Sequence, residues 1–357
     1  MRKFVCILFG VLFLIAASAA GTWATEAFSI YNIPPDHSAA AAKYWTAERM
    51  QNAIPRPTPR KTATPLQSST GTLRPSTDTP GYDPSYDPRQ KGCQTSVLLP
   101  DDEAGSLSTM TDNASIGYNY PPPHTTFYVL SSLYGTNFTP FPYKAIGKVF
   151  FRGTDGEDYV CSGAAIGGRA VLTAGHCLSD EKGTYYTKWI FVPAYHNGEE
   201  PFGKWEASSF LTFDSYHNGG NMARDVAFAV VKNEMGVKLS QKVGHLGFAY
   251  NFSPVQHWSM FGYPAEKPWN GKFMVETEAS YASVDGNKTP NTLGIGTTQL
   301  GGCSGGPWIK DFVPGGNNAS NLANGVNSYS PNGQDYVIFT PYFDSSVKAI
   351  KDEAVAQ

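Results

Sequence analysis

Apolar and polar residues alternate along the chain from about residue 127 onward, in short runs separated by Gly and Asn. Alternation places successive side chains on opposite faces of an extended chain, so each run predicts a β-strand. Short strands joined by turn residues indicate a sandwich or barrels, and not a parallel α/β sheet. The predicted strands are 146–151, 159–166, 170–174, 189–194, 225–231, 258–263, 273–283, 293–297, 307–309, 325–329 and 336–340.

Two segments have the pattern of short helices instead. Residues 38–50, with the sequence SAAAAKYWTAERM, predict one helix capped by Ser38. Residues 343–355 place Val347, Ile350 and Val355 among charged positions, which predicts a helix at the C-terminus.

The N-terminal third of the chain has a different composition. Arg2 and Lys3 precede an apolar run over 4–17 and small residues at 18–20, which is the pattern of a secretory signal peptide. Residues 54–100 are rich in Pro, Thr, Ser and Arg and have neither the helical nor the strand period, which predicts an extended or disordered linker. We therefore predict a signal peptide over 1–20, a Pro/Thr/Ser-rich prosegment and linker over 21–125, and a folded domain over 126–357.

Charge and cysteine content narrow the function classes. The net charge of −3 over 357 residues gives no electrostatic reason to bind nucleic acid or an anionic membrane. Once Cys6 leaves with the signal peptide, four of the five cysteines remain, and an even number in an exported chain predicts two disulfides. The histidines outside the motif described next lack metal-ligand spacing, so we expect no metal and no cofactor. Glycosylation sequons that suit an exported protein are Asn113, Asn137, Asn251, Asn287 and Asn318.

Two motifs far apart in the chain supply a nucleophile and a base. Ser304 lies in the sequence GGCSGGP at 301–307, and His176 lies in TAGHC at 173–177. A serine hydroxyl is a weak nucleophile at its own pKa and needs an adjacent base and donors for the developing oxyanion. Glycines around Ser304 allow a sharp turn that points backbone amides at one place.

Asp225 is the best candidate for a third member of this site. It begins the apolar run RDVAFAV at 224–230, where a carboxylate can be buried and still reach a histidine ring. The alternative is that Asp225 pairs with Arg224 at the start of a strand. Asp214 is a second carboxylate candidate, but its surroundings are polar.

These motifs, in the order His, Asp, Ser, resemble those of the trypsin-like (chymotrypsin-fold) serine proteases. CSGAAI at 161–166 followed by TAGHC, DVA at 225–227, SGGP at 304–307 and GYP at 262–264 carry the resemblance, which is closer to the secreted glutamyl-endopeptidase-like branch than to digestive trypsins. The resemblance implies two six-stranded antiparallel β-barrels with the active site between them. It also implies a catalytic triad of His176, Asp225 and Ser304 and an oxyanion hole made by the amides of Gly302 and Ser304.

The cysteines follow the family in part. The resemblance implies a disulfide between Cys161 and Cys177. Cys303 stands where trypsins carry the aspartate that pairs with the new N-terminal amine, so that activation switch is not expected here. We hypothesise a Cys93–Cys303 disulfide instead; the alternatives are two unpaired thiols, or a buried and inert Cys303.

Alignment with the family also implies the residues of the substrate pocket. Asn327 stands where glutamyl enzymes carry a histidine, which places a preference for glutamate in doubt. No acidic residue is expected in the pocket, so a buried Arg or Lys of a substrate would lack a partner. The expected residues are Thr298 and Gln299 at the base, Ser328, Tyr329 and Ser330 on the wall, and Val337 nearby.

The sequence therefore predicts a secreted, extracellular and monomeric serine endopeptidase that acts on proteins or peptides. The alternative is a non-catalytic secreted binding protein on a protease scaffold. An α/β-hydrolase is disfavoured because its catalytic residues occur in the order Ser, acid, His.

Overall fold

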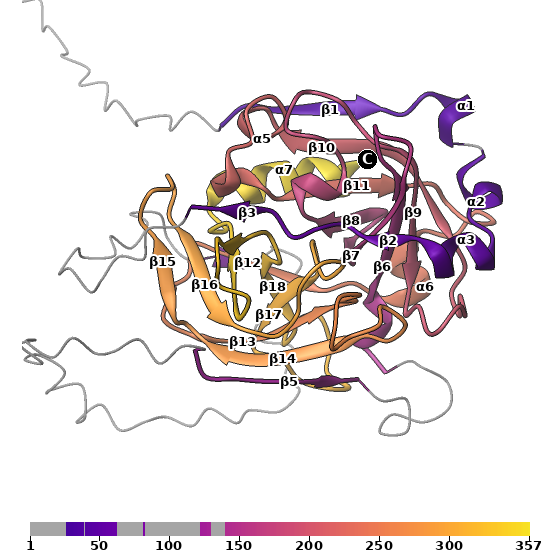
Figure 1. Ribbon diagram of the computed structural model, residues 1–357. Helices are drawn as coiled ribbons and strands as arrows, with labels where there is room; N and C mark the ends of the chain where they lie inside the picture. The colour runs from indigo at the N-terminus through magenta and orange to yellow at the C-terminus, as the bar shows by residue number, and fades with distance from the viewer. Residues whose placement is uncertain (1–25, 39, 63–80, 83–121, 130–139) are drawn as a thin grey trace, which may run out of the picture.

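The computed structural model describes residues 26–38, 40–62, 81–82, 122–129 and 140–357. Strands make up most of the regular secondary structure in this part of the chain, and they form two β-structures that lie one above the other in Figure 1. The predicted signal peptide and Cys93 lie outside the described residues.

Six strands close into the first barrel, as the sequence predicted. Each is antiparallel to its neighbours in the order β9-β6-β7-β8-β11-β10, and the β10–β9 pairing closes the ring. The sequence analysis missed β10, because the small polar residues Ser208 and Ser209 interrupt its apolar pattern. The strands are β6 (Ile146–Arg152), β7 (Asp158–Gly167), β8 (Ala170–Thr173), β9 (Thr187–Pro193), β10 (Trp205–Phe213) and β11 (Ala227–Val231).

The second half of the chain forms two sheets. One is seven-stranded with the order β4-β12-β18-β17-β13-β14-β5, and the other is three-stranded with the order β15-β16-β20. The pairings among the described residues do not join these sheets into a closed six-stranded ring, and the predicted strand 273–283 is divided into β14 and β15. The strands of these two sheets are β4 (Gly81–Tyr82), β5 (His124–Tyr128), β12 (Gly247–Tyr250), β13 (His257–Gly262), β14 (Val275–Ser280), β15 (Ser283–Asp285), β16 (Thr292–Gly296), β17 (Pro307–Lys310), β18 (Leu322–Val326) and β20 (Val337–Thr340). A further strand, β19 (Ser330–Pro331), lies outside both sheets and pairs with Arg60 and Lys61.

Helices are few in the described residues. The predicted C-terminal helix is confirmed as α7 (Ser345–Ala356), which Asp344 caps by accepting from the amides of Ser346 and Val347. The remaining α-helices are α1 (Pro35–Ser38), α2 (Ala41–Tyr44), α3 (Ala47–Asn52), α5 (Asp214–His217) and α6 (Leu239–Val243). None of the helices in this part of the chain is long and apolar enough to cross a membrane.

The single helix predicted over 38–50 is wrong, since three short helices replace it. Trp45 leaves the helical path and is fully buried, with its indole nitrogen donating to the carbonyl of Lys188 at 2.5 Å. Thr46 then caps the start of α3 by accepting from the amide of Arg49. Burial of a large aromatic side chain therefore overrides the helical propensity of the alanines.

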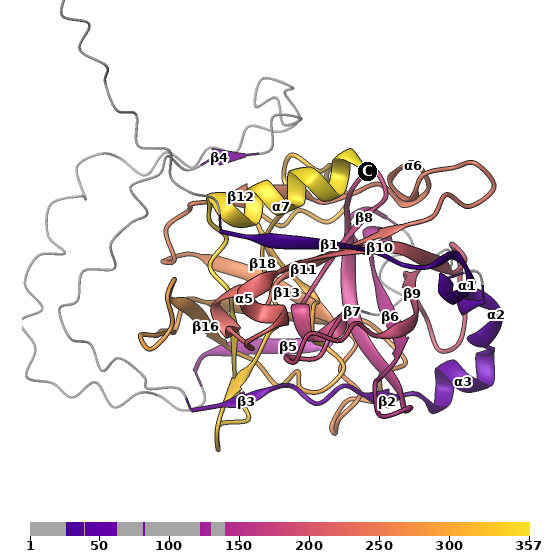
Figure 2. The same cartoon turned by 90° about the horizontal axis from the view of Figure 1, so that it is seen from above.

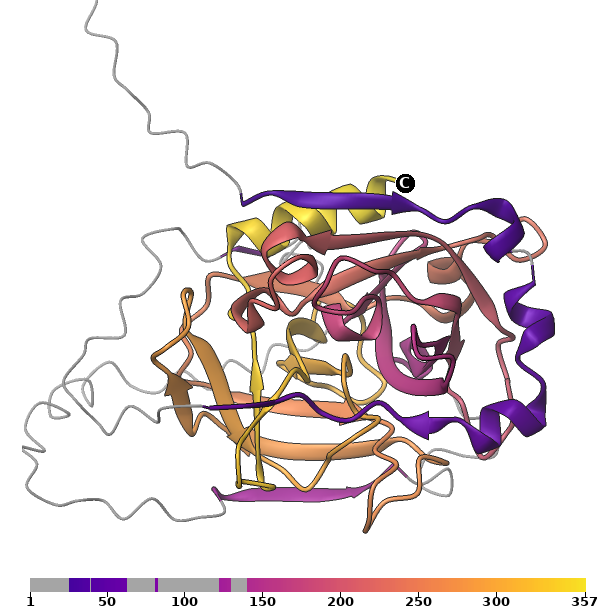
Figure 3. The same cartoon turned by 45° about the horizontal axis from the view of Figure 1, so that its top comes forward.

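Residues 26–38 and 40–62 form what we call the N-terminal belt. It begins with β1 (Phe28–Asn32), which pairs antiparallel with β10, and continues through α1–α3 around the end of the first barrel (Figure 2). Its last part contains β2 (Ile54–Pro55) and β3 (Arg60–Lys61) and passes between the first barrel and the second half of the chain (Figure 3). We call residues 54–61 the crossing segment.

Candidate active site

The fold brings His176 and Asp225 together at neighbouring ends of two paired strands. His176 lies in a 3-10 helix (Gly175–Cys177) directly after β8, and Asp225 lies just before β11; Ala227 of β11 pairs with Thr173 of β8. The ring nitrogen Nδ1 of His176 is 2.8 Å from Oδ2 of Asp225, and the backbone amide of His176 donates to Oδ1 at 2.9 Å. Both side chains are almost completely buried, so the carboxylate holds the imidazole in one orientation.

The alternative partners considered for these carboxylates are occupied elsewhere. The guanidinium of Arg224 pairs with Glu26 of the N-terminal belt and, at 2.8 Å, with Asp344, and not with Asp225. Asp214 accepts a hydrogen bond from the hydroxyl of Ser29 in β1. Asp225 is therefore the carboxylate that the structure places at the histidine.

Ser328 completes the environment of Asp225. Its hydroxyl donates to Oδ2 of Asp225 at 2.5 Å, so the carboxylate receives three hydrogen bonds. The sequence analysis had placed Ser328 on the wall of the substrate pocket, and nothing in the local sequence indicates this contact. We therefore describe it as a residue that orients the carboxylate.

Ser304 lies on a tightly packed turn next to the histidine loop. Gly302 and Gly305 have φ values of +94° and +79°, and a Cβ on Gly306 would lie 1.9 Å from the carbonyl oxygen of Phe261. The amide of Ser162 in β7 donates to the carbonyl of Ser304 at 2.7 Å, and Sγ of Cys177 is 3.6 Å from the same oxygen. These contacts require glycine around Ser304 and fix the serine against the histidine loop.

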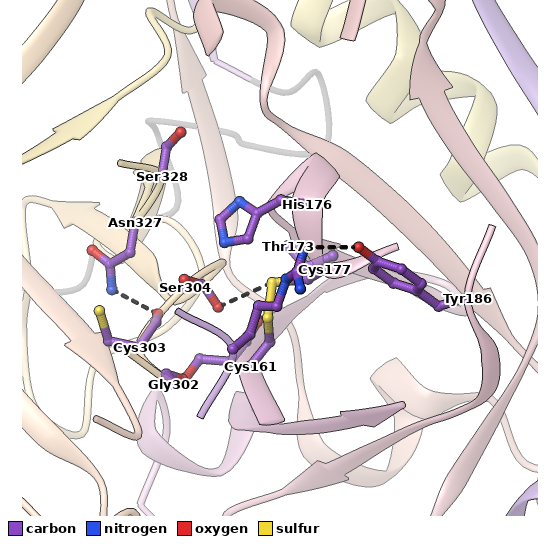
Figure 4. The surroundings of a disulfide bond; sticks show 12 residues. Cys161, Thr173, His176, Cys177, Tyr186, Gly302, Cys303, Ser304, Asn327 and Ser328 are labelled. Atoms are coloured by element: carbon purple, nitrogen blue, oxygen red, sulfur yellow. Dashed lines mark hydrogen bonds between the residues drawn. A yellow bond between two sulfur atoms is a disulfide. The ribbon is translucent and has the colours of Figure 1, made fainter. Parts of the chain in front are cut away.

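The reacting atoms are close to one another in the fold but are not hydrogen-bonded. Figure 4 shows the side chains of His176 and Ser304 with the disulfide beside them. Nε2 of His176 and Oγ of Ser304 are both buried, and neither has a hydrogen-bond partner among the described residues. Buried polar atoms without a partner are rare in proteins, and a catalytic role is one of their recognised explanations.

The disulfide Cys161–Cys177 links β7 to the histidine turn. Closing a loop of this length, with a sequence separation of 16, is worth about 3 kcal/mol of folding stability by the chain-entropy estimate. His176 and these two cysteines form a cluster close enough to hold a metal ion, but sulfurs that are bonded to each other are not available as thiolate ligands.

The hypothesised Cys93–Cys303 disulfide stays a prediction, because Cys93 lies outside the described residues; among the described residues Cys303 has no disulfide partner. Its side chain is fully buried in a cluster with Trp258 and Trp308, and a Cβ on Gly262 would lie only 2.8 Å from its Cβ. Burial raises the pKa of the Cys303 thiol far above its usual range, which keeps it protonated and unreactive. A thiol in this environment is expected to react slowly, if it is not bonded to Cys93.

Two residues expected in the substrate pocket are used inside the protein. The amide nitrogen of Asn327 donates to the carbonyls of Phe261 and Cys303, and its oxygen accepts from the indole nitrogen of Trp308 at 2.7 Å. The side-chain amide of Gln299 is likewise fully buried, and it donates to Thr277 Oγ1 at 3.0 Å. The amide nitrogens of both side chains are therefore used inside the protein, while Oε1 of Gln299 has no hydrogen-bond partner among the described residues.

The other expected pocket residues are buried or half-buried, and several of them are hydrogen-bonded within the protein. The hydroxyl of Tyr329 is bonded to Asp285 at 2.8 Å and to Thr292, and burial raises the pKa of Tyr329 beyond its usual range. Thr298 is half-buried, and its carbonyl accepts from the indole nitrogen of Trp269. Val337 is buried in β20, and Ser330 in β19 faces the N-terminal belt through its amide, which donates to the carbonyl of Pro59.

The N-terminal belt reaches the predicted oxyanion site, which the sequence analysis did not foresee. The amide of Gly302 donates to the carbonyl oxygen of Arg56 at 3.2 Å. A peptide carbonyl of the chain itself therefore occupies one of the two donors expected to hold an oxyanion.

Comparison with known proteins identifies the family. A family model described as Trypsin matches residues 136–350. The chain is 37% identical to the protease Anisep from Arthrobacter nicotinovorans, with a TM-score of 0.55 over 61% of this chain and 99% of that one. It is 34% identical to the thermostable serine protease AL20 from an extremophilic microorganism, with a TM-score of 0.55 over 60% and 98% of the two chains.

Among curated proteins, the glutamyl endopeptidase of Bacillus licheniformis is 27% identical over 135 residues. That match covers 37% of this chain and 40% of the relative, so the chain aligns with less than half of that protein. The resemblance inferred from the sequence motifs is confirmed: the chain belongs to the trypsin family.

Proposed function

We propose that the protein is a secreted serine endopeptidase that hydrolyses peptide bonds through Ser304, His176 and Asp225. The observation that carries the proposal is the 2.8 Å contact between His176 Nδ1 and Asp225, with the opposite ring nitrogen buried and unpaired beside the Ser304 loop. A serine nucleophile requires a histidine whose Nδ1 is held by a carboxylate and whose Nε2 is available to accept the hydroxyl proton.

The mechanism follows from this arrangement. Oγ of Ser304 attacks the carbonyl carbon of the scissile bond, and Nε2 of His176 takes the hydroxyl proton. The amides of Gly302 and Ser304 hold the oxyanion of the tetrahedral intermediate. The C–N bond then breaks as His176 gives its proton to the leaving amine. Water attacks the resulting acyl-enzyme with His176 again as the base, which releases the acid and restores Ser304.

The proposed substrates are proteins or peptides. The residues at the base of the pocket, Thr298 and Gln299, carry no charge, so an Arg or Lys before the scissile bond would have no acidic partner. We do not propose a preference for glutamate before the scissile bond, although a relative is named a glutamyl endopeptidase. Asn327 stands in place of the expected histidine, and its side-chain amide is hydrogen-bonded inside the protein. Small, polar and apolar residues remain as the candidate substrate side chains.

Three further parts of the proposal rest on the sequence. They are the signal peptide over 1–20, the division into a prosegment over 21–125 and a protease domain over 126–357, and the monomeric state. β5 begins at His124 and pairs with β14, which places this boundary inside a strand of the second half. Of the sequons, Asn251 is buried and bonded to Ser345, so it is a poor acceptor in the folded protein.

Labelling with a fluorophosphonate probe tests the proposed activity. The full chain and the chain after limited proteolysis are each treated with the probe, and Ser304→Ala serves as the control. We expect covalent labelling of the proteolysed wild type and none of Ser304→Ala. If the folded wild type is not labelled even after proteolysis has removed residues 26–62, the non-catalytic binding protein is the better assignment.

A further inference from the structure

The crossing segment is paired with strands on both sides of the candidate active site. Ile54 and Pro55 in β2 lie opposite Tyr159 and Val160 of β7, which leads directly to the disulfide at Cys161. At the other end, β3 lies opposite β19, two residues after Ser328. Both pairings are parallel, so the segment runs from the β7 side to the β19 side.

Backbone hydrogen bonds continue along the segment between these two ends. The amide of Arg56 donates to the carbonyl of Val160 at 3.0 Å, and its own carbonyl accepts from the amide of Gly302. The carbonyl of Pro59 accepts from Ser330, and the carbonyl of Lys61 accepts from Asn332, each at 3.0 Å. An extended peptide is therefore bound along the whole width of the site by its main chain, which is how strand addition recognises a peptide.

Three basic side chains fasten the segment to the walls of the site. The guanidinium of Arg56 lies over the rings of Tyr159 and Tyr186, 5.2 Å and 5.6 Å from their centroids, and donates to the hydroxyl of Tyr186 at 3.0 Å. Arg60 pairs with Asp335 at 2.7 Å, and Lys61 pairs with Glu181 at 3.0 Å. These contacts use charge complementarity and cation–π attraction as well as backbone pairing.

The segment lies where Ser304 would meet a substrate. Ser304 has no exposed surface and His176 is 2% exposed, although both would have to contact a substrate in the proposed mechanism. Thr58, in the middle of the segment, is also buried, so the segment is enclosed by the protein between its two paired ends.

We propose that residues 54–61 are a built-in inhibitory peptide that fills the substrate-binding site and occupies the oxyanion donor Gly302 with the carbonyl of Arg56. This proposal rests on the proposed function, since it assigns an occupant to the same site. The bound peptide belongs to the stretch that its composition and its lack of a regular period had predicted to be a linker.

Two features protect the segment from the enzyme that it blocks. Its peptide bonds Ile54–Pro55, Arg56–Pro57 and Thr58–Pro59 all precede proline, whose nitrogen is a ring member with no N–H. The segment pairs parallel with β7 and β19. A substrate that paired antiparallel with these strands would run in the opposite chain direction, so the peptide bonds of the segment are reversed relative to those of such a substrate. The prolines also stiffen the free segment and lower the entropy lost when it binds.

The rest of the N-terminal belt holds the inhibitory peptide at high local concentration. β1 pairs over five residues with β10, Trp45 is fully buried, and the hydroxyl of Tyr44 donates to Asp158 at 2.6 Å. Tethering makes rebinding intramolecular, so cutting the chain downstream of residue 62 leaves the peptide in place. Activation therefore requires cleavage or displacement of the belt itself.

The test measures how fast the uncut full chain reacts with the fluorophosphonate probe. In Arg56→Ala/Arg60→Ala we expect labelling of Ser304 to be about tenfold faster than in wild type, because hydrogen bonds to charged side chains are lost at both ends of the segment. Arg169→Ala is the matched control: Arg169 lies between β7 and β8 and donates to the carbonyl of Val231 at 3.4 Å, outside the N-terminal belt. Equal rates for wild type and the double variant, or an equal rise in Arg169→Ala, would overturn the proposal.

Hydrogen exchange separates failure of the inhibition from failure of the catalytic function. It is followed at the amide of Gly302 in Ser304→Ala backgrounds, which needs no activity. Slow exchange in the otherwise wild-type chain and faster exchange with Arg56→Ala/Arg60→Ala support an occupied site, whatever the labelling shows. Equal exchange in both chains overturns the inhibitory segment. Absence of labelling in Arg56→Ala/Arg60→Ala with Ser304 intact, when exchange at Gly302 shows that the site has opened, by contrast overturns the catalytic function.

Discussion

The hydroxyl of Ser328 donates to the same oxygen of Asp225 that contacts the ring of His176. The two bonds fix that oxygen in the plane where the imidazole needs it, and the backbone amide of His176 fixes the other oxygen. The orientation of the proposed base therefore depends on a serine that contacts neither the reacting atoms nor the histidine.

Replacing this serine tests its positioning role. We expect Ser328→Ala to lower kcat about tenfold with KM almost unchanged, because an outer partner that orients the acid typically contributes a factor of this size. Steady-state kinetics on the activated protease measure both constants. Ser259→Ala, a buried serine of β13, should leave kcat unchanged. A rise in KM at constant kcat would return Ser328 to the pocket wall.

A substitution of Asn327 tests whether its side chain contacts substrate, as expected from the sequence, or stabilises the fold through its internal hydrogen bonds. Asn327→Ala leaves the indole nitrogen of Trp308 without its partner and removes one of the two donors to the carbonyl of Cys303, so we expect a loss of about 2 kcal/mol in unfolding free energy. Urea unfolding of the inactive Ser304→Ala background measures this loss. A substrate-library profile supplies the second readout: a changed preference with unchanged stability would place Asn327 in the pocket after all.

Cys303 should be chemically silent in the folded protein. Burial removes both access and thiolate character, so we expect no alkylation of Cys303 by iodoacetamide at neutral pH and complete alkylation in denaturant. Mass mapping of the peptide that contains Cys303 gives the answer. Alkylation of the native protein at this residue would show that the loop before Ser304 opens to solvent.

Local pattern was enough to predict much of the fold. Short apolar runs between turn residues located most strands of the first barrel, in which nearly all positions are buried, and a stripe of apolar residues located the C-terminal helix. The order of His176, Asp225 and Ser304 was also readable, since each lies in a motif whose backbone needs are local, such as the glycines around Ser304.

The contacts that shape the site could not be read in the same way. Ser328 and Asn327 act on residues about 100 and 24 positions away, and a serine or asparagine carries no local sign of such a partner. The crossing segment was interpreted as linker because it has no period of its own. Its extended form is fixed by strands β7 and β19 and by ion pairs to distant residues, which only the folded protein supplies.

Glu276 should make folding stability depend on pH. Its side chain is nearly fully buried on β14, and burial, together with a hydrogen bond to the like-charged Glu278, raises its pKa to about 9. The folded protein then keeps a proton that the unfolded chain loses above its ordinary pKa of 4.5. Stability from this group is therefore complete below about pH 4.5 and falls, by up to about 1.4 kcal/mol per pH unit, as the pH rises toward 9.

Glu276→Gln removes this dependence, because the amide is neutral in both states and can still donate to Glu278. We expect the unfolding free energy of Ser304→Ala/Glu276→Gln to exceed that of Ser304→Ala at pH 8, with the gap narrowing toward pH 5. Urea unfolding at several pH values measures the gap, and Glu353→Gln, on the exposed face of α7, should follow the Ser304→Ala profile. If the unfolding free energies of the Glu276 and Glu353 variants changed with pH in the same way, Glu276 would be ionised in the folded protein. Its charge would then have to be balanced by other groups in the sheet and not removed by protonation.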